Sequence, residues 1–280
     1  MTAGAAPERP LFSSLRGRVT TALRPARTRS AARRRAAVQR ELAARPVLEL
    51  CPVCAGPGAW SWRPVISSLL ATQWRLSSRE RAVLDVQQGH SCTRCGLTLR
   101  ARALARALLD VVEQASPLSA GLASVPDLRV LEINPAGGLS SHLAAAAVHV
   151  QTSYPEVDME RLPYADGSFD LVVHSDTLEH VADAEQGIRE CLRVAGRGWV
   201  VFTTPVLPGR VSRLRGQWAS RSYHGGDGSR SLVFHEFGGD IWTIPAAAGA
   251  TEVRLHVSDH PYALVISCRR SVATEGAGAA

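Results

Sequence analysis

Short apolar runs alternate with longer amphipathic stretches over the second half of the chain. Four runs of four to six residues have the composition of buried parallel strands: 130–133, 148–152, 169–174 and 199–204. Three stretches have helical spacing of apolar residues: 139–147, 184–194 and 240–248. This alternation predicts an α/β fold built on a doubly wound, mostly parallel sheet.

The first predicted strand leads into a turn of small residues. Strand 130–133 is followed by Asn134-Pro135-Ala136-Gly137-Gly138, and the next helix begins near Ser140. A tight turn lets the backbone approach a ligand, and the free N–H groups of a helix start attract nucleotide-like molecules. The spacing of the glycines is not that of the dinucleotide fingerprint, so nicotinamide or flavin binding has little support.

Four cysteines form two Cys-x-x-Cys pairs ahead of this region. Cys51 and Cys54 make the first pair, and Cys92 and Cys95 make the second. Two such pairs suit tetrahedral Zn²⁺, because each pair spans one edge of the tetrahedron and the protein then fills all four positions. A redox or disulfide role is the alternative. We favour structural zinc, since paired knuckles in a chain without secretory features typically hold metal.

Helical patterns lie on both sides of the second cysteine pair. Ser77 and Glu80 form a capping box at the start of one helix. In the next helix, 97–112, leucines and alanines share one face. The arginines expected off that face are Arg100, Arg102 and Arg106. The remaining cysteines, Cys191 and Cys268, lie in apolar stretches and are expected in the core.

The positive charge of the chain belongs to its N-terminal tail. The net charge is +7 over 280 residues, but residues 1–50 hold eleven arginines and three glutamates, so the tail carries +8 and the remainder −1. A solvated arm is the favoured interpretation; a surface for nucleic acid or anionic lipid and an organelle transit peptide are the alternatives. No apolar run approaches the ~20 residues of a membrane span, and a cytoplasmic protein is expected.

Two downstream segments resemble a known family. The run 158–173 is similar to the "Asp-x-x-x-Leu-Pro-Phe-x-Asp-x-Ser-Phe-Asp-Leu-Val" segment of class I S-adenosylmethionine-dependent methyltransferases (methyltransferase type 11-like), and 178–181 matches their "Leu-Glu-His-Val". The turn after the first strand resembles their acidic-x-Gly-x-Gly-x-Gly motif: Glu132 and Gly138 keep its ends, whereas Asn134 and Ala136 replace two glycines. A zinc ribbon precedes such a domain in some bacterial relatives.

The resemblance implies a cofactor and its site. The acidic residue matching Asp158 contacts the adenine amino group, and the segment after Ser175 caps the pocket and faces the methyl group. The implied cofactor, S-adenosyl-L-methionine, would be bound by Glu132, Asn134, Ala136, Gly138, Asp158 and Ser175. No carboxylate stands at 152–154, where the family places its ribose ligand.

Chain length limits one edge of the expected sheet. Only five residues separate Thr152 from Asp158, whereas a parallel neighbour needs a crossover of about a dozen. We therefore expect a Rossmann-like class I methyltransferase sheet with a truncated edge, closed by strands 253–257 and 264–268. The expected domains are a basic tail (1–46), a zinc module (47–116), the methyltransferase domain (117–270) with a substrate lid (205–239), and a frayed tail (271–280).

The favoured function is methyl transfer from S-adenosylmethionine to a small-molecule or sugar hydroxyl. A hydroxyl acceptor calls for a general base, and the candidates are His235, His180, His224, Asp176 and Glu236. His235 is preferred because it lies between Phe234 and Phe237. A small-molecule acceptor is the expected partner. Nucleic acid is the less favoured one, and the oligomeric state is open. The alternatives are a non-catalytic scaffold with this fold and an RNA-binding or RNA-modifying protein.

Overall fold

The computed structural model describes residues 50–57, 60–115, 117–215, 223–224, 231–258 and 263–270, together with Arg33, Ala36 and Arg40. These three isolated residues are helical; the rest of the expected arm 1–46, and the tail 271–280, lie outside the described residues. No helix among the described residues is long and apolar enough to span a membrane.

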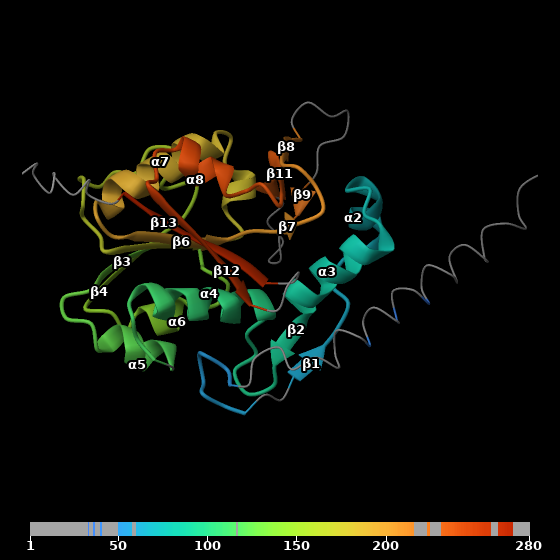
Figure 1. Ribbon diagram of the computed structural model, residues 1–280, viewed down its shortest axis with the longest axis horizontal. Coiled ribbons are helices and arrows are strands. Elements are labelled where there is room, and N and C mark those ends of the chain that lie inside the picture. Colours follow the sequence, from blue (N-terminus) through green and yellow to red (C-terminus); the bar gives the residue numbers. More distant parts are fainter. Residues whose placement is uncertain are drawn as a thin grey trace, which may run out of the picture.

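A six-stranded sheet forms the centre of the molecule (Figure 1). Its strands are β3 (Arg129–Ile133), β4 (Val148–Thr152), β5 (Leu171–Ser175), β6 (Trp199–Thr203), β12 (Glu252–Ser258) and β13 (Ala263–Arg269). The spatial order is β12-β13-β6-β5-β3-β4. Strands β3, β4, β5 and β6 are parallel to one another, and β13 runs antiparallel to both β6 and β12. The expected doubly wound, mostly parallel sheet with an antiparallel closing pair is confirmed.

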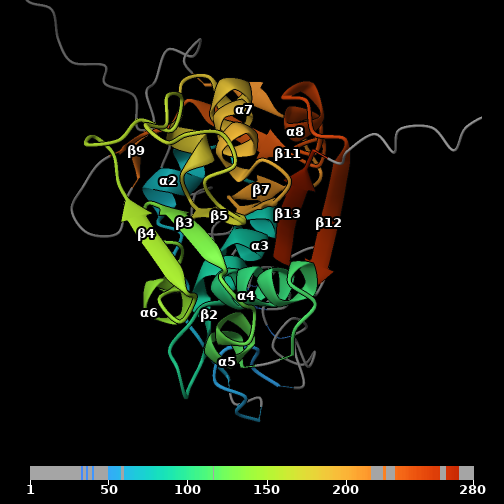
Figure 2. The ribbon, with the colours of Figure 1, turned by 90° about the vertical axis from the view of Figure 1, so that its left-hand side faces the viewer.

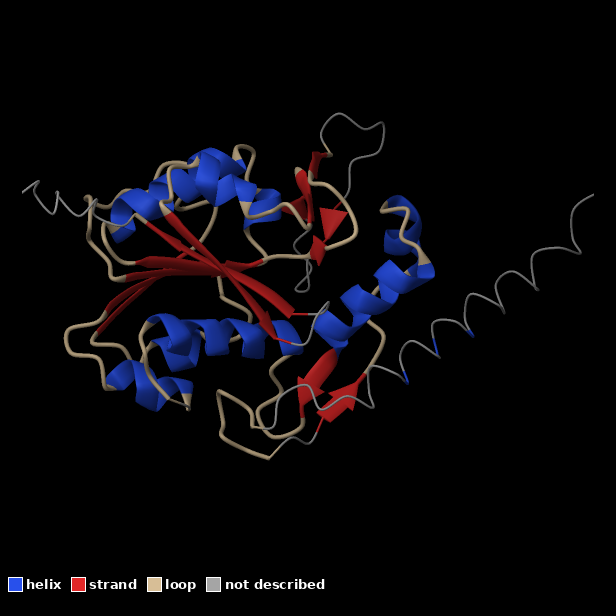
Figure 3. Cartoon of the chain, viewed as in Figure 1, coloured by secondary structure: helices blue, strands red, loops and turns tan. Residues whose placement is uncertain are grey.

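Helices cover both faces of the sheet (Figure 3). One face carries α4 (Leu99–Val111), α5 (Leu118–Ala123) and α6 (Ser140–Leu143), and the other carries α7 (Ala184–Ala195) and α8 (Thr243–Ala247). Helix α7 begins where predicted, because the Asp183 carboxylate caps it by accepting from the N–H of Gln186 at 3.0 Å. Cys191 and Cys268 are fully buried on the α7 side, as expected.

Two predicted helices are shorter than expected. Helix α6 ends at Leu143 rather than at Ala147, because the chain must enter β4 at Val148 and residues 144–147 only make turns. Helix α8 begins at Thr243 rather than at Asp240, and Pro245 falls in its first turn, where a missing N–H costs nothing.

The truncated edge is confirmed. Residues 153–170 contain no strand, so β4 lies at the sheet edge and β5 forms on the other side of β3. Arg193 of α7 holds this long segment by donating to the carbonyls of Tyr164 at 2.7 Å and Leu162 at 2.9 Å. The segment therefore lies against α7 instead of extending the sheet.

The cysteine-containing module lies at the N-terminal end of α4. It contains the hairpin of β1 (Trp60–Trp62) and β2 (His90–Cys92), and the helices α2 (Ser68–Gln73) and α3 (Ser78–Gly89). The predicted capping box of α3 is present, with both Ser77–Glu80 hydrogen bonds formed. The helix predicted over 97–112 is also present, as α4. Arg100 and Arg102, which were expected off its apolar face, are nevertheless buried, with 2% and 0% of their surface exposed.

The insertion after β6 forms small sheets beside the main one. Strands β7 (Val206–Leu207), β11 (His235–Gly238) and β8 (Arg213–Leu214) lie in that order, and β9 (Tyr223–His224) pairs with β10 (Ser231–Leu232). Arg210 ties this insertion to the module, because its guanidinium binds Glu236 of β11, Glu80 of α3 and the carbonyl of Trp74. The insertion and the helices α2 and α3 thus form one packed unit.

The turn between α7 and β6 allows no side chain at Gly198. A Cβ there would lie 2.2 Å from the carbonyl oxygen of Asp170. We expect Gly198→Ala to lower the free energy of unfolding by about 1–3 kcal/mol, the usual cost of overpacking. Gly209→Ala is the matched control, since no atom lies within 4 Å of its Cβ position. Thermal unfolding should show a lower Tm for the first variant alone; equal Tm values would contradict this.

Candidate functional site

The strand order defines where a ligand would bind. The chain passes from β3 to β4 on one side and then to β5 on the other, so the direction of winding reverses at β3 (Figure 2). In open α/β sheets the ligand crevice lies outside the carboxyl ends of the strands at this reversal. Two segments border it here: the turn 134–138 after β3 and residues 176–180 after β5.

Glu132 holds the turn from below. Its side chain is fully buried, and Oε1 accepts from the N–H of Ala136 and from the hydroxyl of Ser140, both at 2.7 Å. Oε2 lies 2.9 Å from Nε2 of His149 on β4. Both carboxylate oxygens are thus used within the protein. Glu132 would act on a bound ligand through the shape of the turn.

Asn134 keeps the backbone shape of a glycine but adds a bridge. Its φ is +56°, a left-handed conformation that asparagine adopts more readily than most residues. The side-chain Nδ2 donates to Thr177 Oγ1 at 3.2 Å, and Oδ1 accepts from the N–H of Tyr154 at 3.2 Å. This amide therefore spans the crevice from β4 to β5. Gly137 and Gly138 also have positive φ, +64° and +85°.

The other predicted cofactor residues are divided between two places. Ser175 lies at the crevice, where its hydroxyl donates to Asp176 at 2.9 Å. Asp158 is exposed on the segment after β4, and its carboxylate accepts from the N–H of Glu160 at 2.9 Å. Glu132, Asn134, Ala136, Gly138 and Ser175 are therefore brought together around the reversal point, while Asp158 lies on the loop beyond the edge strand.

Helix α4 forms a wall of the crevice, which sequence analysis did not predict. A Cβ on Gly137 would lie 3.3 Å from Cβ of Ala101 and 3.5 Å from the hydroxyl of Ser175. One residue earlier, Arg100 forms an ion pair with Asp176 directly after β5. A helical pattern alone cannot reveal a partner 76 positions away along the chain, so no signal in the sequence marks this pair.

The four cysteines of the module converge on one point. Their Sγ atoms lie within 4.8 Å of one another, with Cys51–Cys95 at 3.7 Å and Cys54–Cys92 at 3.8 Å. A tetrahedral site with Zn–S bonds of about 2.3 Å has S–S edges of about 3.8 Å. The donor set therefore fits tetrahedral zinc, and the sulfurs are too far apart for disulfides.

A buried arginine lies beside this cysteine cluster. Arg102 is completely buried, its guanidinium stacks 3.8 Å above the Trp60 ring, and Nη2 lies 3.1 Å from Nδ1 of His90. Burial and the charge of Arg102 lower the pKa of His90 to about 4, so His90 is neutral and accepts this hydrogen bond. Burial also lowers the pKa of Arg102, whereas the charges of the four cysteines raise it.

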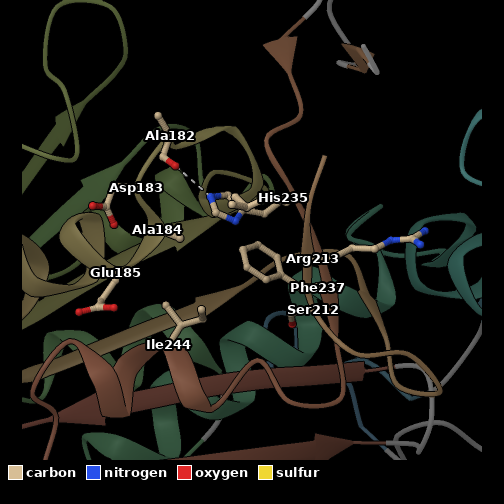
Figure 4. A pocket seen from close by; sticks show the side chains of 10 residues that line it. Ala182, Asp183, Ala184, Glu185, Ser212, Arg213, His235, Phe237 and Ile244 are labelled. Carbon is tan, nitrogen blue, oxygen red and sulfur yellow. Dashed lines mark hydrogen bonds between the residues drawn. The ribbon is translucent and has the colours of Figure 1, made fainter. Parts of the chain in front are cut away.

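A groove of about 470 Å³ lies between the start of α7 and the insertion (Figure 4). Its lining consists of Ala182, Asp183, Ala184, Glu185, Ser212, Arg213, Leu214, His235, Phe237 and Ile244. His235 and Phe237 point into it, whereas the side chain of Arg213 points away. The lining thus combines apolar side chains, such as Phe237 and Ile244, with two carboxylates and one imidazole.

The histidines predicted as bases differ in their surroundings. His235 donates from Nε2 to the carbonyl of Ala182 at 3.2 Å, and because a carbonyl only accepts, Nδ1 keeps the lone pair. Burial lowers the pKa of His235, so it is neutral near pH 7. His180 lies 2.8 Å from the carbonyl of Leu232 in the insertion. The side chain of His224 lies outside the described residues.

Glu179 is a further buried group near the crevice that sequence analysis did not single out. It lies on the 3₁₀ turn η1 (Leu178–His180), is 1% exposed, and accepts from the hydroxyl of Thr204 at 2.6 Å. Burial and the nearby charge of Asp176 raise its pKa. Because the N–H of Phe234 donates to the Glu179 carbonyl at 2.8 Å, this residue also joins the insertion to the sheet.

Comparison with known proteins agrees with this topology. Residues 116–202 match a family described as a methyltransferase domain. A segment of 54 residues is 44% identical to norajmaline N-methyltransferase of Rauvolfia serpentina, covering 19% of this chain and 18% of that protein. Over 66 residues the chain is 38% identical to a probable S-adenosylmethionine-dependent methyltransferase of Mycobacterium tuberculosis, covering 21% of this chain and 24% of that protein.

Among solved structures, the citrinin polyketide synthase CMeT domain is similar, with a TM-score of 0.38 and 13% identity over 72% of this chain and 56% of that one. The chain spans about a quarter or less of the length of the two sequence relatives named above. Its strand order and its glycine turn agree with the match of residues 116–202 to a methyltransferase domain, and a four-cysteine module precedes that region.

Proposed function

We propose that the protein transfers a methyl group from S-adenosylmethionine to a small-molecule acceptor. The observation that carries this proposal is the turn 134–138. It lies at the reversal point of the sheet, and its residues Asn134, Gly137 and Gly138 have positive φ. The residues around it support this proposal: Glu132 fixes the turn, the Ser175 hydroxyl lies 3.5 Å from the Cβ position of Gly137, and Arg100 pairs with Asp176 directly after β5.

The groove beside α7 would receive the acceptor. It adjoins the segment that follows β5, and its apolar lining from Phe237 and Ile244 suits a small organic molecule. The lone pair of Nδ1 on His235 can accept the proton of a hydroxyl, which supports O-methylation of a sugar or other small-molecule hydroxyl. An amine is the second candidate, since Asp183 and Glu185 border the groove and two relatives are named N-methyltransferases.

The cofactor would supply the methyl group, and the protein would position the acceptor and take up its proton. When bound, S-adenosylmethionine supplies an electrophilic methyl carbon on a sulfonium. The residues of this chain would position the acceptor in line with that carbon, exclude water with the insertion, and hold the released proton at Nδ1 of His235. The bridge made by Asn134 across the crevice favours modest cofactor affinity, because the side chain must leave Thr177 or Tyr154 for a ligand to enter.

The four-cysteine cluster would hold structural Zn²⁺. Cys51, Cys54, Cys92 and Cys95 supply four sulfur ligands at tetrahedral separations, which leaves no open position for a substrate. The ion would stabilise the hairpin of β1 and β2 and the start of α4.

The metal site predicts a stoichiometry and a stability effect. The purified protein should contain one zinc per chain, measured by elemental analysis. Cys51→Ser should lose the metal and lower the Tm, because metal binding supplies much of the folding free energy of such modules. Cys268→Ser, at a buried cysteine outside the cluster, should keep one zinc per chain. A metal-free wild type that unfolds as before in chelator would contradict this assignment.

The turn predicts how cofactor affinity depends on Glu132. Glu132→Ala removes the acceptor for Ala136 and Ser140, so we expect the Kd for S-adenosylmethionine to rise roughly 10- to 100-fold, the worth of hydrogen bonds to a charged group. Glu113→Ala, at an exposed carboxylate after α4, is the control. Calorimetry that detects no binding to the wild type at millimolar cofactor would instead support the non-catalytic scaffold.

His235 predicts an acid limb in the pH–rate profile. The pKa of His235 lies below the ordinary 6.5, and the neutral imidazole is the base. The turnover rate should therefore be maximal near pH 7 and fall only below pH 6.5. His235→Gln should lower turnover roughly 100-fold and remove this limb without changing cofactor affinity. Transfer of a labelled methyl group to a panel of hydroxyl and amine acceptors is the measurement. Turnover within a few-fold of wild type would make His235 a structural residue.

A further inference from the structure

Arg100 carries a positive charge that is buried and only partly paired. Its side chain is 3% exposed, and Nη1 binds the carboxylate of Asp176. Nε and Nη2, which form the other edge of the guanidinium, have no hydrogen-bond partner among the described residues. A buried cation with unpaired N–H groups is costly, and such groups are normally satisfied by a ligand or by water.

The unpaired edge of Arg100 has a defined chemical preference. Nε and Nη2 present two parallel N–H groups, the geometry that binds a carboxylate with two hydrogen bonds. Arg100 also lies beside the crevice. The neighbouring Ala101 packs on Gly137 of the turn 134–138, called the ligand turn below, and Asp176 directly follows β5. S-adenosylmethionine has one anionic group, the carboxylate of its amino-acid end.

We propose that Arg100 binds the carboxylate of the cofactor, and that the four-cysteine module holds Arg100 in place for this task. The proposal rests on the function proposed above and adds a binding residue from outside the matched methyltransferase region 116–202. Asp176 keeps the guanidinium oriented when no ligand is present.

The module reaches Arg100 through helix α4. Two residues further along the helix, Arg102 is buried beside the cysteine cluster, and among the described residues it forms no ion pair with a carboxylate. Its guanidinium lies 3.8 Å above the Trp60 ring and 3.1 Å from Nδ1 of His90, so it packs against the β1–β2 hairpin that ends at Cys92. Leu97, two residues after Cys95, lies 3.1 Å from the Cβ position of Gly138. The cluster and the ligand turn thus share one short, rigid segment.

The test compares ligands with and without the carboxylate. Calorimetry on the full chain with zinc bound uses S-adenosylhomocysteine, its decarboxylated analogue and 5′-methylthioadenosine. Wild type should bind S-adenosylhomocysteine at least 10-fold more tightly than the other two, a difference that needs no mutation. Arg100→Met should weaken S-adenosylhomocysteine roughly 10- to 100-fold and change the carboxylate-free ligands less than 3-fold. Arg106→Met, on the same helix and half-buried, should change none of them.

The outcomes separate this inference from the proposed function. If wild type binds S-adenosylhomocysteine no more tightly than the decarboxylated analogue, or if Arg100→Met weakens all three ligands equally, the role of Arg100 is overturned while cofactor binding stands. If wild type binds none of them, the proposed function fails. Removing zinc with a chelator should reduce the preference for S-adenosylhomocysteine at least 10-fold. A metal-free protein that keeps the full preference would overturn the role of the module.

Discussion

The burial of helix α4 against the sheet is the contact on which the other features depend. Its apolar side chains pack on β6, β12 and β13, and its first turn contacts the cysteine cluster and the ligand turn. Two buried arginines on this helix make contacts at its two neighbours. Arg100 pairs with Asp176 after β5, and Arg102 packs on Trp60 and His90 of the four-cysteine module. The module is therefore part of the domain's packing.

The second constraint is the length of chain between β4 and β5. Residues 153–170 form no further strand, so the sheet ends at β4, and Arg193 holds this segment on α7. The crevice loses the wall that an additional strand would supply. Asn134 partly replaces that wall, since its side chain connects the end of β4 with the start of the segment after β5.

Sequence analysis predicted the elements whose cause is local. The strands follow from short apolar runs, α7 from the cap Asp183, and α3 from the Ser77–Glu80 box. Helices α6 and α8 were overextended because helical spacing continues past the point where the chain must turn. Motifs placed Glu132 at the turn and brought the four cysteines together in pairs, as the structure has them. The burial of Arg100 and its pairing with Asp176 depend on tertiary contacts, and a buried arginine and an exposed one look alike in a periodic pattern.

The clamp made by Arg210 bears on how the sequences of the insertion and the module can change. One guanidinium joins Glu80 of α3, Glu236 of β11 and the carbonyls of Trp74 and Arg75. Exchanging the insertion for an unrelated one would remove Arg210. Glu80, which lies in the module 130 positions earlier in the chain, would then lose its ion-pair partner. The sequence can vary most easily at exposed groove positions such as Leu214, which is 48% exposed and takes no part in this network. The insertion and the module are, in this sense, inherited together.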